Sequence, residues 1–283
     1  MREYYRVCGN LPTEAYEVAV AEWYALGMAG CEETAVDAST TAVRIYFHER
    51  SAAQCAAAAL EQCAAGGVTC EPVVNEDWNA RWRGSMQPAL LAPGWWVSPL
   101  WLEPPLSEGD RWIRIEPKMA FGTGHHETTR LATRAILGCG ELLRGGRFLD
   151  IGTGSGVLCF VAAMLDAGNC VGVEIDPDCR GNLTENRRLN ALLRCSFIIG
   201  PVDALSAAGM FDVIVMNMIH TESAPLLGRC RELLAPDGLL LWSGILGDEY
   251  GRAVDAAGRQ SFLLAGEMRE NEWWCGTFAK DNR

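Results

Sequence analysis

From residue 126 to residue 259 the sequence alternates short apolar runs with amphipathic helical segments. Strands have a side-chain period of two and helices a period of 3.6, so the pattern separates the two kinds of segment. Such alternation is typical of a parallel sheet that carries helices on both faces. The expected strands are 147–151, 169–175, 195–199, 211–217 and 239–244, and the expected helices are 126–138, 156–166, 177–190, 221–233 and 248–259.

The last part of the chain departs from this alternation. The segments SFLLAGEMRE and NEWWCGTFAK, which meet near Glu270 and Asn271, are typical of strands and have no helix between them. Two consecutive strands joined by a short turn pair antiparallel. The sequence therefore predicts an α/β domain whose sheet begins parallel and ends in an antiparallel hairpin.

A different order of elements precedes residue 75. Strand patterns at 3–8, 31–36, 41–48 and 68–74 enclose helical patterns at 13–27 and 51–65. The order β-α-β-β-α-β is that of the ferredoxin-like fold. We therefore expect residues 1–74 to form a small α+β domain, since a chain of 283 residues is long enough for two cores.

Residues 75–117 connect the two predicted domains. Trp78 and Trp82 stand four residues apart in a short helical pattern, which places both rings on one face. We favour a contact between domains over a ligand stack for this pair. Two strand-like runs, WWVSPLW and RWIRIEP, then lead into the larger domain, which spans residues 118–283.

Composition limits the class of protein. Hydrophobic residues make up 49% and charged residues 21%, as in folded globular proteins, and no apolar run approaches the roughly 20 residues of a membrane helix. The first residues contain no apolar signal core, so we expect a cytoplasmic protein that does not bind membranes.

The formal charge of −12 disfavours direct binding to nucleic acid. A basic protein partner and simple solubility explain this charge equally well. The twelve cysteines form no Cys-x-x-Cys pair, so we interpret most of them as small buried apolar side chains and not as zinc ligands.

The segment DIGTGSG at 150–156 follows an apolar strand and opens a helix. In this context the backbone N–H groups of a glycine loop meet the polar parts of a nucleotide. The spacing Gly152-x-Gly154-x-Gly156 differs from the Gly-x-Gly-x-x-Gly of dinucleotide-binding loops. Asp150 at the loop entrance would repel a pyrophosphate and attract the ammonium and sulfonium charges of S-adenosylmethionine. We therefore predict that cofactor and disfavour a dinucleotide oxidoreductase.

Polar side chains also follow the next three strands. Glu174 ends the second strand, and an acidic side chain about twenty residues beyond a glycine loop accepts the ribose hydroxyls. Asp203, after the third strand, is either a contact of the adenine amine or a solvated acid, and the sequence does not favour one over the other. Asn217, at the end of the fourth strand, is the predicted catalytic residue. It would face the methyl group and accept a hydrogen bond from an amine nucleophile, although it could instead cap the next helix.

The segment FGTGHHETTR at 121–130 carries a second glycine pair. We expect it to fold over the cofactor as a lid, with Thr128 or Thr129 facing the ligand from the start of the next helix. Adjacent residues such as His125 and His126 point about 100° apart on a helix and no third ligand is near in sequence, which disfavours a metal site. These histidines would instead cap the helix or line the substrate entrance.

Together these segments resemble the PrmA family, methyltransferases of protein eleven of the large ribosomal subunit. The matching segments are EDWNARW, IEPKMAFGTGHHETTR, LDIGTGSGVL, GVEIDP, NMI, WSGIL and EWWCGTFAK. The FGTG-His-His-x-Thr-Thr element is the specific one, because Gly-x-Gly-x-Gly loops occur in many unrelated methyltransferases. The sequence departs from the family at His125-His126-Glu127, where Thr-His-Pro is common, at Glu174, where Asp is more usual, and at HTES after NMI.

The resemblance implies a class I, Rossmann-like methyltransferase domain with a seven-stranded sheet, behind a ferredoxin-like domain that recognises the substrate. It also implies S-adenosylmethionine as methyl donor, and lysine ε-amines or the N-terminal α-amine of a basic ribosomal protein as acceptors. By motif the cofactor contacts would fall on Thr129, Gly152, Glu174 and Asn217, with Phe121 and Thr123 in the covering loop. A methyltransferase of another protein or of a small-molecule amine, and a non-catalytic protein that binds the same cofactor, are the alternatives.

Overall fold

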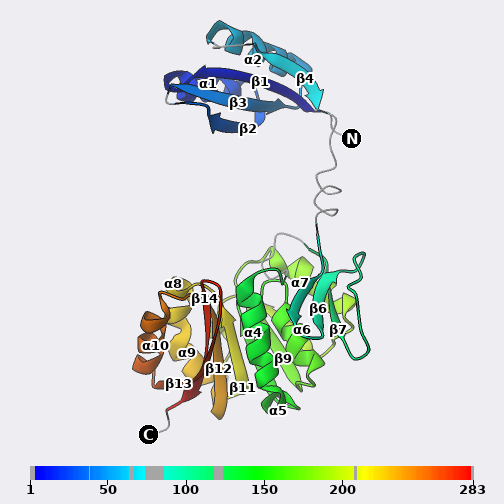
Figure 1. The fold of residues 1–283 in the computed structure, drawn as a ribbon, viewed down its shortest axis with the longest axis vertical. Coiled ribbons are helices and arrows are strands. Elements are labelled where there is room, and N and C mark those ends of the chain that lie inside the picture. Colours follow the sequence, from blue (N-terminus) through cyan, green and yellow to red (C-terminus); the bar gives the residue numbers. More distant parts are fainter. Residues whose placement is uncertain are drawn as a thin grey trace. The chain divides into compact units, whose positions relative to one another are not determined.

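The structure of the chain is a computed structural model that describes residues 4–37, 39–63, 67–73, 86–117, 124–206 and 209–281. The chain divides into two compact units, Met1–Met86 and Gln87–Arg283 (Figure 1). Each unit buries its own apolar side chains.

The first unit is a four-stranded antiparallel sheet with two helices. Its elements are β1 (Tyr4–Pro12), a 3-10 turn (Thr13–Ala15), α1 (Tyr16–Ala25), β2 (Met28–Ala35), β3 (Thr40–Phe47), α2 (Arg50–Cys63) and β4 (Thr69–Val73). The sheet order is β2-β3-β1-β4, so β1 and β3 are central. Their alternate residues Val7, Ile45 and Phe47 share one core with Trp23 of α1 and Leu60 of α2. The elements of this unit follow one another in the order β-α-β-β-α-β.

The second unit is built around a seven-stranded sheet. Its strands are β8 (Arg147–Ile151), β9 (Asn169–Glu174), β10 (Cys195–Ile199), β11 (Phe211–Asn217), β12 (Leu234–Leu246), β13 (Phe262–Glu270) and β14 (Trp273–Lys280). They lie in the order β10-β9-β8-β11-β12-β14-β13. The first five of these run parallel, and β14 pairs antiparallel with β12 and with β13. The seven-stranded sheet and its antiparallel terminal hairpin are therefore confirmed.

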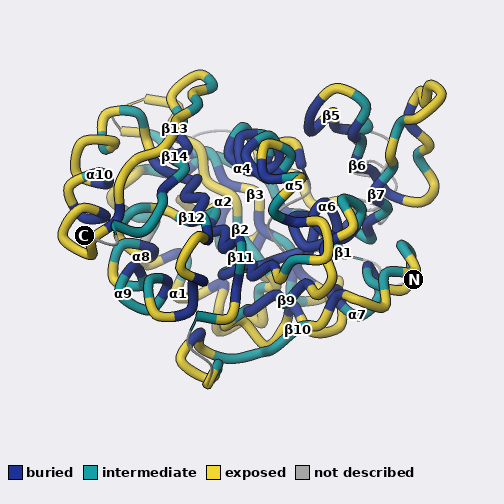
Figure 2. Tube along the Cα trace, turned by 90° about the horizontal axis from the view of Figure 1, so that it is seen from below, coloured by how far each residue is buried: buried dark blue, intermediate teal, exposed yellow. Residues whose placement is uncertain are grey.

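Helices cover both faces of this sheet. α4 (Glu127–Gly138) and α5 (Gly140–Leu143) precede β8, whereas α6 (Val157–Met164) and α7 (Cys179–Leu189) follow β8 and β9. α9 (Leu227–Leu233) and α10 (Tyr250–Arg259) lie before and after β12 in the sequence. α4 and α6 share a core with Phe148 and Val213, whereas α9 and α10 share one with Leu149 and Trp242. Because neighbouring residues of a strand point to opposite faces, these are the two sides of one sheet. Figure 2 shows its central strands as largely buried.

The helix predicted over 221–233 is divided into three pieces. They are α8 (His220–Ser223), a 3-10 turn (Ala224–Leu226) and α9. Pro225 lies in the turn, where it supplies no backbone N–H for a continuous helical ladder. β12 also begins earlier than predicted, at Leu234.

Three further strands belong to the second unit. They are β5 (Ala89–Ala92), β6 (Trp95–Pro99) and β7 (Arg111–Ile115), and they form a small sheet in the order β5-β6-β7. Leu91, Val97 and Ile113 of this sheet pack in the same core as Leu131 and Ile136 of α4. The strands expected within 75–117 are therefore part of the body of the larger unit, while Trp78 and Trp82 lie outside the described residues.

Among the described residues, no helix combines the length and the apolar character needed to span a membrane. Seven of the twelve cysteines are buried, in agreement with their interpretation as apolar side chains. Cys55, Cys63 and Cys70 are exposed, because they lie on the outer side of α2 and on the edge strand β4.

Candidate functional site

A cleft of about 810 Å³ lies at the carboxyl ends of the parallel strands. Its walls come from the ends of β8, β9 and β11 and from the segment after β10. In open parallel sheets this edge is where ligands bind. The cleft brings together five residues that were predicted as site residues from separate motifs: Gly152, Gly154, Glu174, Asp203 and Asn217.

The loop after β8 has left-handed backbone conformation at each of its three glycines. The φ angle is +74° at Gly152, +54° at Gly154 and +86° at Gly156. A residue with a side chain is strained in this region. A Cβ atom on Gly152 would also come within 2.8 Å of the sulfur of Met218. The path of the backbone from β8 into α6 therefore requires glycine.

Glu174, the last residue of β9, holds this loop. Its Oε2 accepts a hydrogen bond from the Gly154 N–H at 2.9 Å, and its Oε1 accepts one from the Asp176 N–H at 3.1 Å. A carboxylate has about four acceptor positions, so Glu174 keeps two for a ligand. Both Glu174 and Asp176 line the cleft, as the alternation along the strand predicts.

Asp150 does not lie on the cleft surface. It is 1% exposed, and β8 is flanked by β9 and β11. Its Oδ2 accepts a hydrogen bond from the Thr153 hydroxyl at 2.6 Å, while its buried Oδ1 has no partner among the described residues. Burial raises the pKa of Asp150 to about 7, and the charge of Glu174 acts in the same direction, against the Thr153 hydrogen bond. Asp150 thus supports the loop from the protein interior, through its hydrogen bond to Thr153. The sequence had instead predicted an exposed position at the loop entrance.

Asn217 ends β11 and lines the cleft. Its Nδ2 donates to the hydroxyl of Thr129, 3.4 Å away in the first turn of α4. Its Oδ1 is buried and has no hydrogen-bond partner in the described part of the chain. A buried oxygen left without a donor costs about 1–3 kcal/mol, so the site favours a bound molecule that donates an N–H. Thr129 is 1% exposed and is connected to the cleft through Asn217.

Asp203 follows β10 and lines the cleft with a side chain that is 79% exposed. The Arg229 Nε lies 3.7 Å from its Oδ1. The exposure and the ion pair fit the interpretation as a solvated acid. Its position on the cleft wall also leaves it available to a ligand.

His126 is the N-cap of α4. Its Nδ1 accepts a hydrogen bond from the Thr128 N–H at 3.3 Å, and its ring meets Trp273 edge to face at 4.9 Å. The predicted capping role is therefore confirmed for His126, while the His125 Nε2 lies 2.8 Å from the carbonyl oxygen of Gln87. Within the described ranges, no three His, Cys, Asp or Glu side chains form a group that could hold a metal ion.

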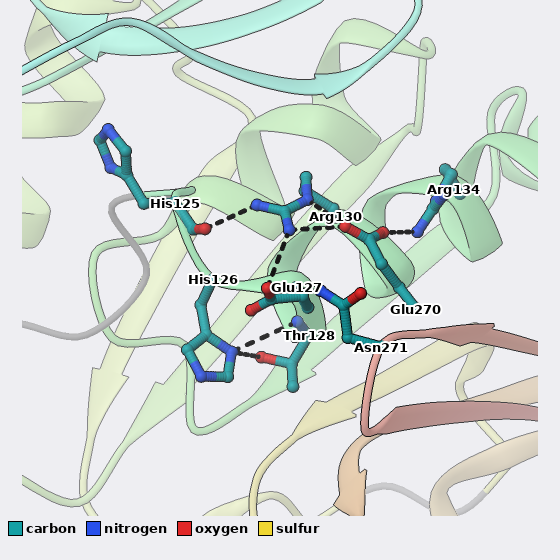
Figure 3. A network of polar contacts seen from close by, with 8 residues as sticks. All are labelled: His125, His126, Glu127, Thr128, Arg130, Arg134, Glu270 and Asn271. Atoms are coloured by element: carbon teal, nitrogen blue, oxygen red, sulfur yellow. Dashed lines mark hydrogen bonds and ion pairs between the residues drawn. The ribbon is translucent and has the colours of Figure 1, made fainter. Parts of the chain in front are cut away.

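The first turns of α4 are fixed to the hairpin between β13 and β14 (Figure 3). Glu270 at the end of β13 accepts from the Arg130 Nε at 2.6 Å and also from Arg134. The Asn271 Nδ2 donates to Glu127 at 3.1 Å. These contacts hold the helix that carries Thr129 against a strand pair far away in sequence. Phe121 and Thr123, the predicted contacts of the covering loop, lie outside the described residues.

The apolar wall of the cleft was not predicted from the sequence. Ile175 is 75% exposed and Ile219 is 50% exposed, although both are large apolar residues in the cleft lining. Met218 and Leu226 line it as well. These two residues could have been identified from the sequence, because Ile175 directly follows Glu174 and Ile219 comes two residues after Asn217, both near strand ends.

A family model and relatives found by sequence point to one family. A family model described as ribosomal protein L11 methyltransferase (PrmA) matches residues 11–281. The ribosomal protein L11 methyltransferase of Geobacter sp. (strain M21) is 37% identical over 76% of this chain and 72% of its own length. That of Thermus thermophilus is 40% identical over 72% of this chain and 77% of its own length.

A crystal structure of ribosomal protein L11 methylase from Lactobacillus delbrueckii subsp. bulgaricus has a similar fold. Its TM-score is 0.64 and its sequence identity is 25%, and the match covers 70% of this chain and all 100% of that one. With a family model matched from the end of the first strand almost to the last residue, the chain belongs to the PrmA family of ribosomal protein L11 methyltransferases.

Proposed function

We propose that this chain transfers methyl groups from S-adenosylmethionine to amino groups of ribosomal protein L11. Its family and the names of its relatives support the reaction and the substrate. The structural observation that carries the proposal is the Oδ1 of Asn217, a buried acceptor without a partner among the described residues, in a cleft formed by the methyltransferase motifs.

The cleft suits the charge and shape of S-adenosylmethionine. Glu174, Asp176 and Asp203 line it, and none of the described lining residues is Lys or Arg, which favours a cationic ligand over a pyrophosphate. Gly152 and Gly154 leave room for close approach of the ligand to the backbone. When bound, the cofactor supplies a methyl group on a positively charged sulfur.

Each predicted contact has a role in this proposal. Glu174 accepts hydrogen bonds from the ribose hydroxyls, and Asp203 accepts from the adenine amine. Thr129 fixes the side chain of Asn217 through their hydrogen bond, and Asp150 fixes the glycine loop through Thr153. The covering-loop residues Phe121 and Thr123 are predicted to close over the ligand.

The substrate amine must be neutral to react. A free lysine has a pKa near 10.4, so only about one in 10³ is unprotonated at neutral pH, which is a deficit of roughly 4 kcal/mol. An N-terminal amine, with a pKa near 7.7–8.0, needs less help. Asn217 accepts an N–H of the amine at Oδ1 and thereby directs the nitrogen lone pair, while proton loss to water precedes the transfer.

The replacement Asn217→Ala tests this role. It should lower turnover by on the order of 10²-fold, as when one preorganised hydrogen-bond partner is removed from an active site, and this loss should exceed any loss of cofactor affinity. Asn169→Ala is the matched control, because Asn169 is exposed at the opposite end of the strands and should keep wild-type turnover. Wild-type turnover in Asn217→Ala would contradict the assigned role.

Mass spectrometry of purified L11, incubated with enzyme and methyl donor, tests the substrate. We expect added methyl groups on lysine or N-terminal amines. Methylation of another protein or of a small-molecule amine instead of L11 would overturn the substrate assignment. If the chain binds the cofactor but methylates no amine, it is a non-catalytic protein that binds the cofactor. We also propose that the enzyme recognises its substrate through protein and not through RNA, and that it acts in the cytoplasm.

The first unit is proposed to recognise the substrate. It has its own core, centred on β1 and β3, and no residue of the cleft comes from it. Deleting residues 1–86 should therefore preserve cofactor affinity, which also reports that the second unit is folded, and should abolish methylation of L11. Normal methylation of L11 by the shortened chain would contradict this division of roles.

A further inference from the structure

Two asparagines of α7 and a third at its C-cap have a structural role that the motifs do not reveal. Asn182, Asn186 and Asn190 follow one another at intervals of four residues and therefore lie along one face of the helix. Asn182 is 3% exposed and Asn186 is 0% exposed. Most amides buried this deeply in a protein are hydrogen-bonded, because a buried polar group without a partner costs free energy.

These side chains pair with the free edge of β7. In the small sheet, β7 pairs with β6 on one side only, so the N–H and C=O groups of alternate residues point away from the sheet. The Asn190 Oδ1 accepts from the Arg114 N–H at 2.9 Å and its Nδ2 donates to the Arg114 carbonyl at 2.6 Å. The helix thus takes the place of a missing neighbouring strand.

The pairing continues at Glu116, directly after β7. The Asn186 Oδ1 accepts from the Glu116 N–H at 2.7 Å, and the Asn182 Nδ2 donates to the Glu116 carbonyl at 2.7 Å. Asn186 makes one contact that the other two do not. Its Nδ2 donates to the carbonyl oxygen of Ser155 at 2.9 Å, between Gly154 and Gly156 of the glycine loop.

We infer that Asn186 is a positioning residue for the cofactor cleft, because one amide joins the glycine loop to the end of β7. Its carbonyl holds Glu116 and its NH₂ group holds Ser155, so neither Asp nor an apolar residue could make both bonds. From the other side, Glu174 holds the N–H of Gly154. The loop is thereby fixed at two successive residues, and its N–H groups are set before the ligand arrives.

The inference rests on the proposed cofactor site, and paired variants test it. Asn186→Ala and Asn190→Ala each remove three hydrogen bonds, but only the first frees the glycine loop. The readouts are thermal stability and, by titration calorimetry of the full chain, the Kd for S-adenosylhomocysteine. We expect Asn186→Ala to raise Kd about tenfold, the affinity equivalent of one lost buried hydrogen bond, and Asn190→Ala to change it less than about twofold.

A purely structural role would lower the thermal stability of both variants and leave Kd the same in both, which would overturn the inference. If Asn186→Ala does not fold, amide hydrogen exchange of the wild-type protein decides the question. Binding of S-adenosylhomocysteine should then slow exchange at the Glu116 N–H more than at the Arg114 N–H. If binding slows exchange only in the glycine loop and leaves the Glu116 and Arg114 N–H groups equal, the link between Asn186 and the cofactor cleft is refuted.

The two proposals fail in different ways. A wild-type protein that gives no heat with S-adenosylhomocysteine would refute the proposed cofactor site, and the role of Asn186 with it. Wild-type binding together with equal Kd values for Asn186→Ala and Asn190→Ala would refute the role of Asn186 alone.

Discussion

The buried carboxyl group of Asp150 makes the stability of the second unit depend on pH. Its pKa is about 7 in the folded chain against an ordinary value of 3.8, because burial disfavours the charged form. An acid with a raised pKa binds more protons in the folded state. Its contribution to stability is therefore complete below pH 3.8 and is lost as the pH rises through 7.

The linkage relation gives the size of this effect. With folded and unfolded pKa values of about 7 and 3.8, the free energy of unfolding contributed by Asp150 falls by roughly 2.5 kcal/mol between pH 5 and pH 8. Asp150→Asn keeps the shape of the side chain but cannot titrate. Relative to this variant, the wild-type protein should therefore lose about that much stability over this range.

Urea denaturation of both proteins at several pH values measures the difference. Tryptophan fluorescence is a suitable signal, because Trp242 and Trp274 are fully buried in the second unit. A carboxyl carbon NMR titration of the wild-type protein measures the pKa of Asp150 directly. Parallel stability curves for the two proteins, or a titration midpoint below about 5, would refute the reasoning.

Three further substitutions have expected outcomes. Glu174→Gln removes the charge that accepts from the Gly154 N–H, and should raise the Kd for S-adenosylmethionine at least about tenfold in calorimetry; an unchanged Kd would exclude Glu174 as a ligand contact. Glu270→Gln weakens the ion pair with Arg130 and should lower the free energy of unfolding by roughly 1 kcal/mol at low salt and by less at 1 M salt. An equal loss at both salt concentrations would argue against an ionic contribution. Gly152→Ala places a side chain on left-handed backbone with a φ angle of +74°, and should lower stability by about 1–2 kcal/mol and weaken cofactor binding. A variant with unchanged stability and unchanged cofactor affinity would contradict the strain.

Local patterns in the sequence were sufficient to predict much of the larger unit. The strands at 147–151, 195–199 and 211–217 agree with β8, β10 and β11 to the residue, because each is a short and mainly apolar run. The cleft positions of Gly152 and Asn217 could be predicted for a related reason. Gly152 directly follows β8 and Asn217 is the last residue of β11, and the carboxyl ends of parallel strands share one edge of the sheet.

The depth of a side chain within that edge could not be predicted in the same way. Asp150 immediately precedes the glycine loop, and the sequence placed its charge at the entrance of the cleft. Whether a loop covers such a residue depends on backbone angles at three glycines, which carry no side-chain pattern. The structure buries Asp150 under the loop and leaves Glu174 to face the cleft.

By itself, the sequence predicted most of the strands and helices, since these depend on residues a few positions apart. It also placed the glycine loop, Glu174 and Asn217 at strand ends. Only the tertiary structure joined Asn217 to Thr129, Glu270 to α4, and Asn186 to both Glu116 and Ser155. Such contacts connect segments tens of residues apart, and they depend on strand order and helix packing. The local periodicity of the sequence contains no information on strand order or helix packing.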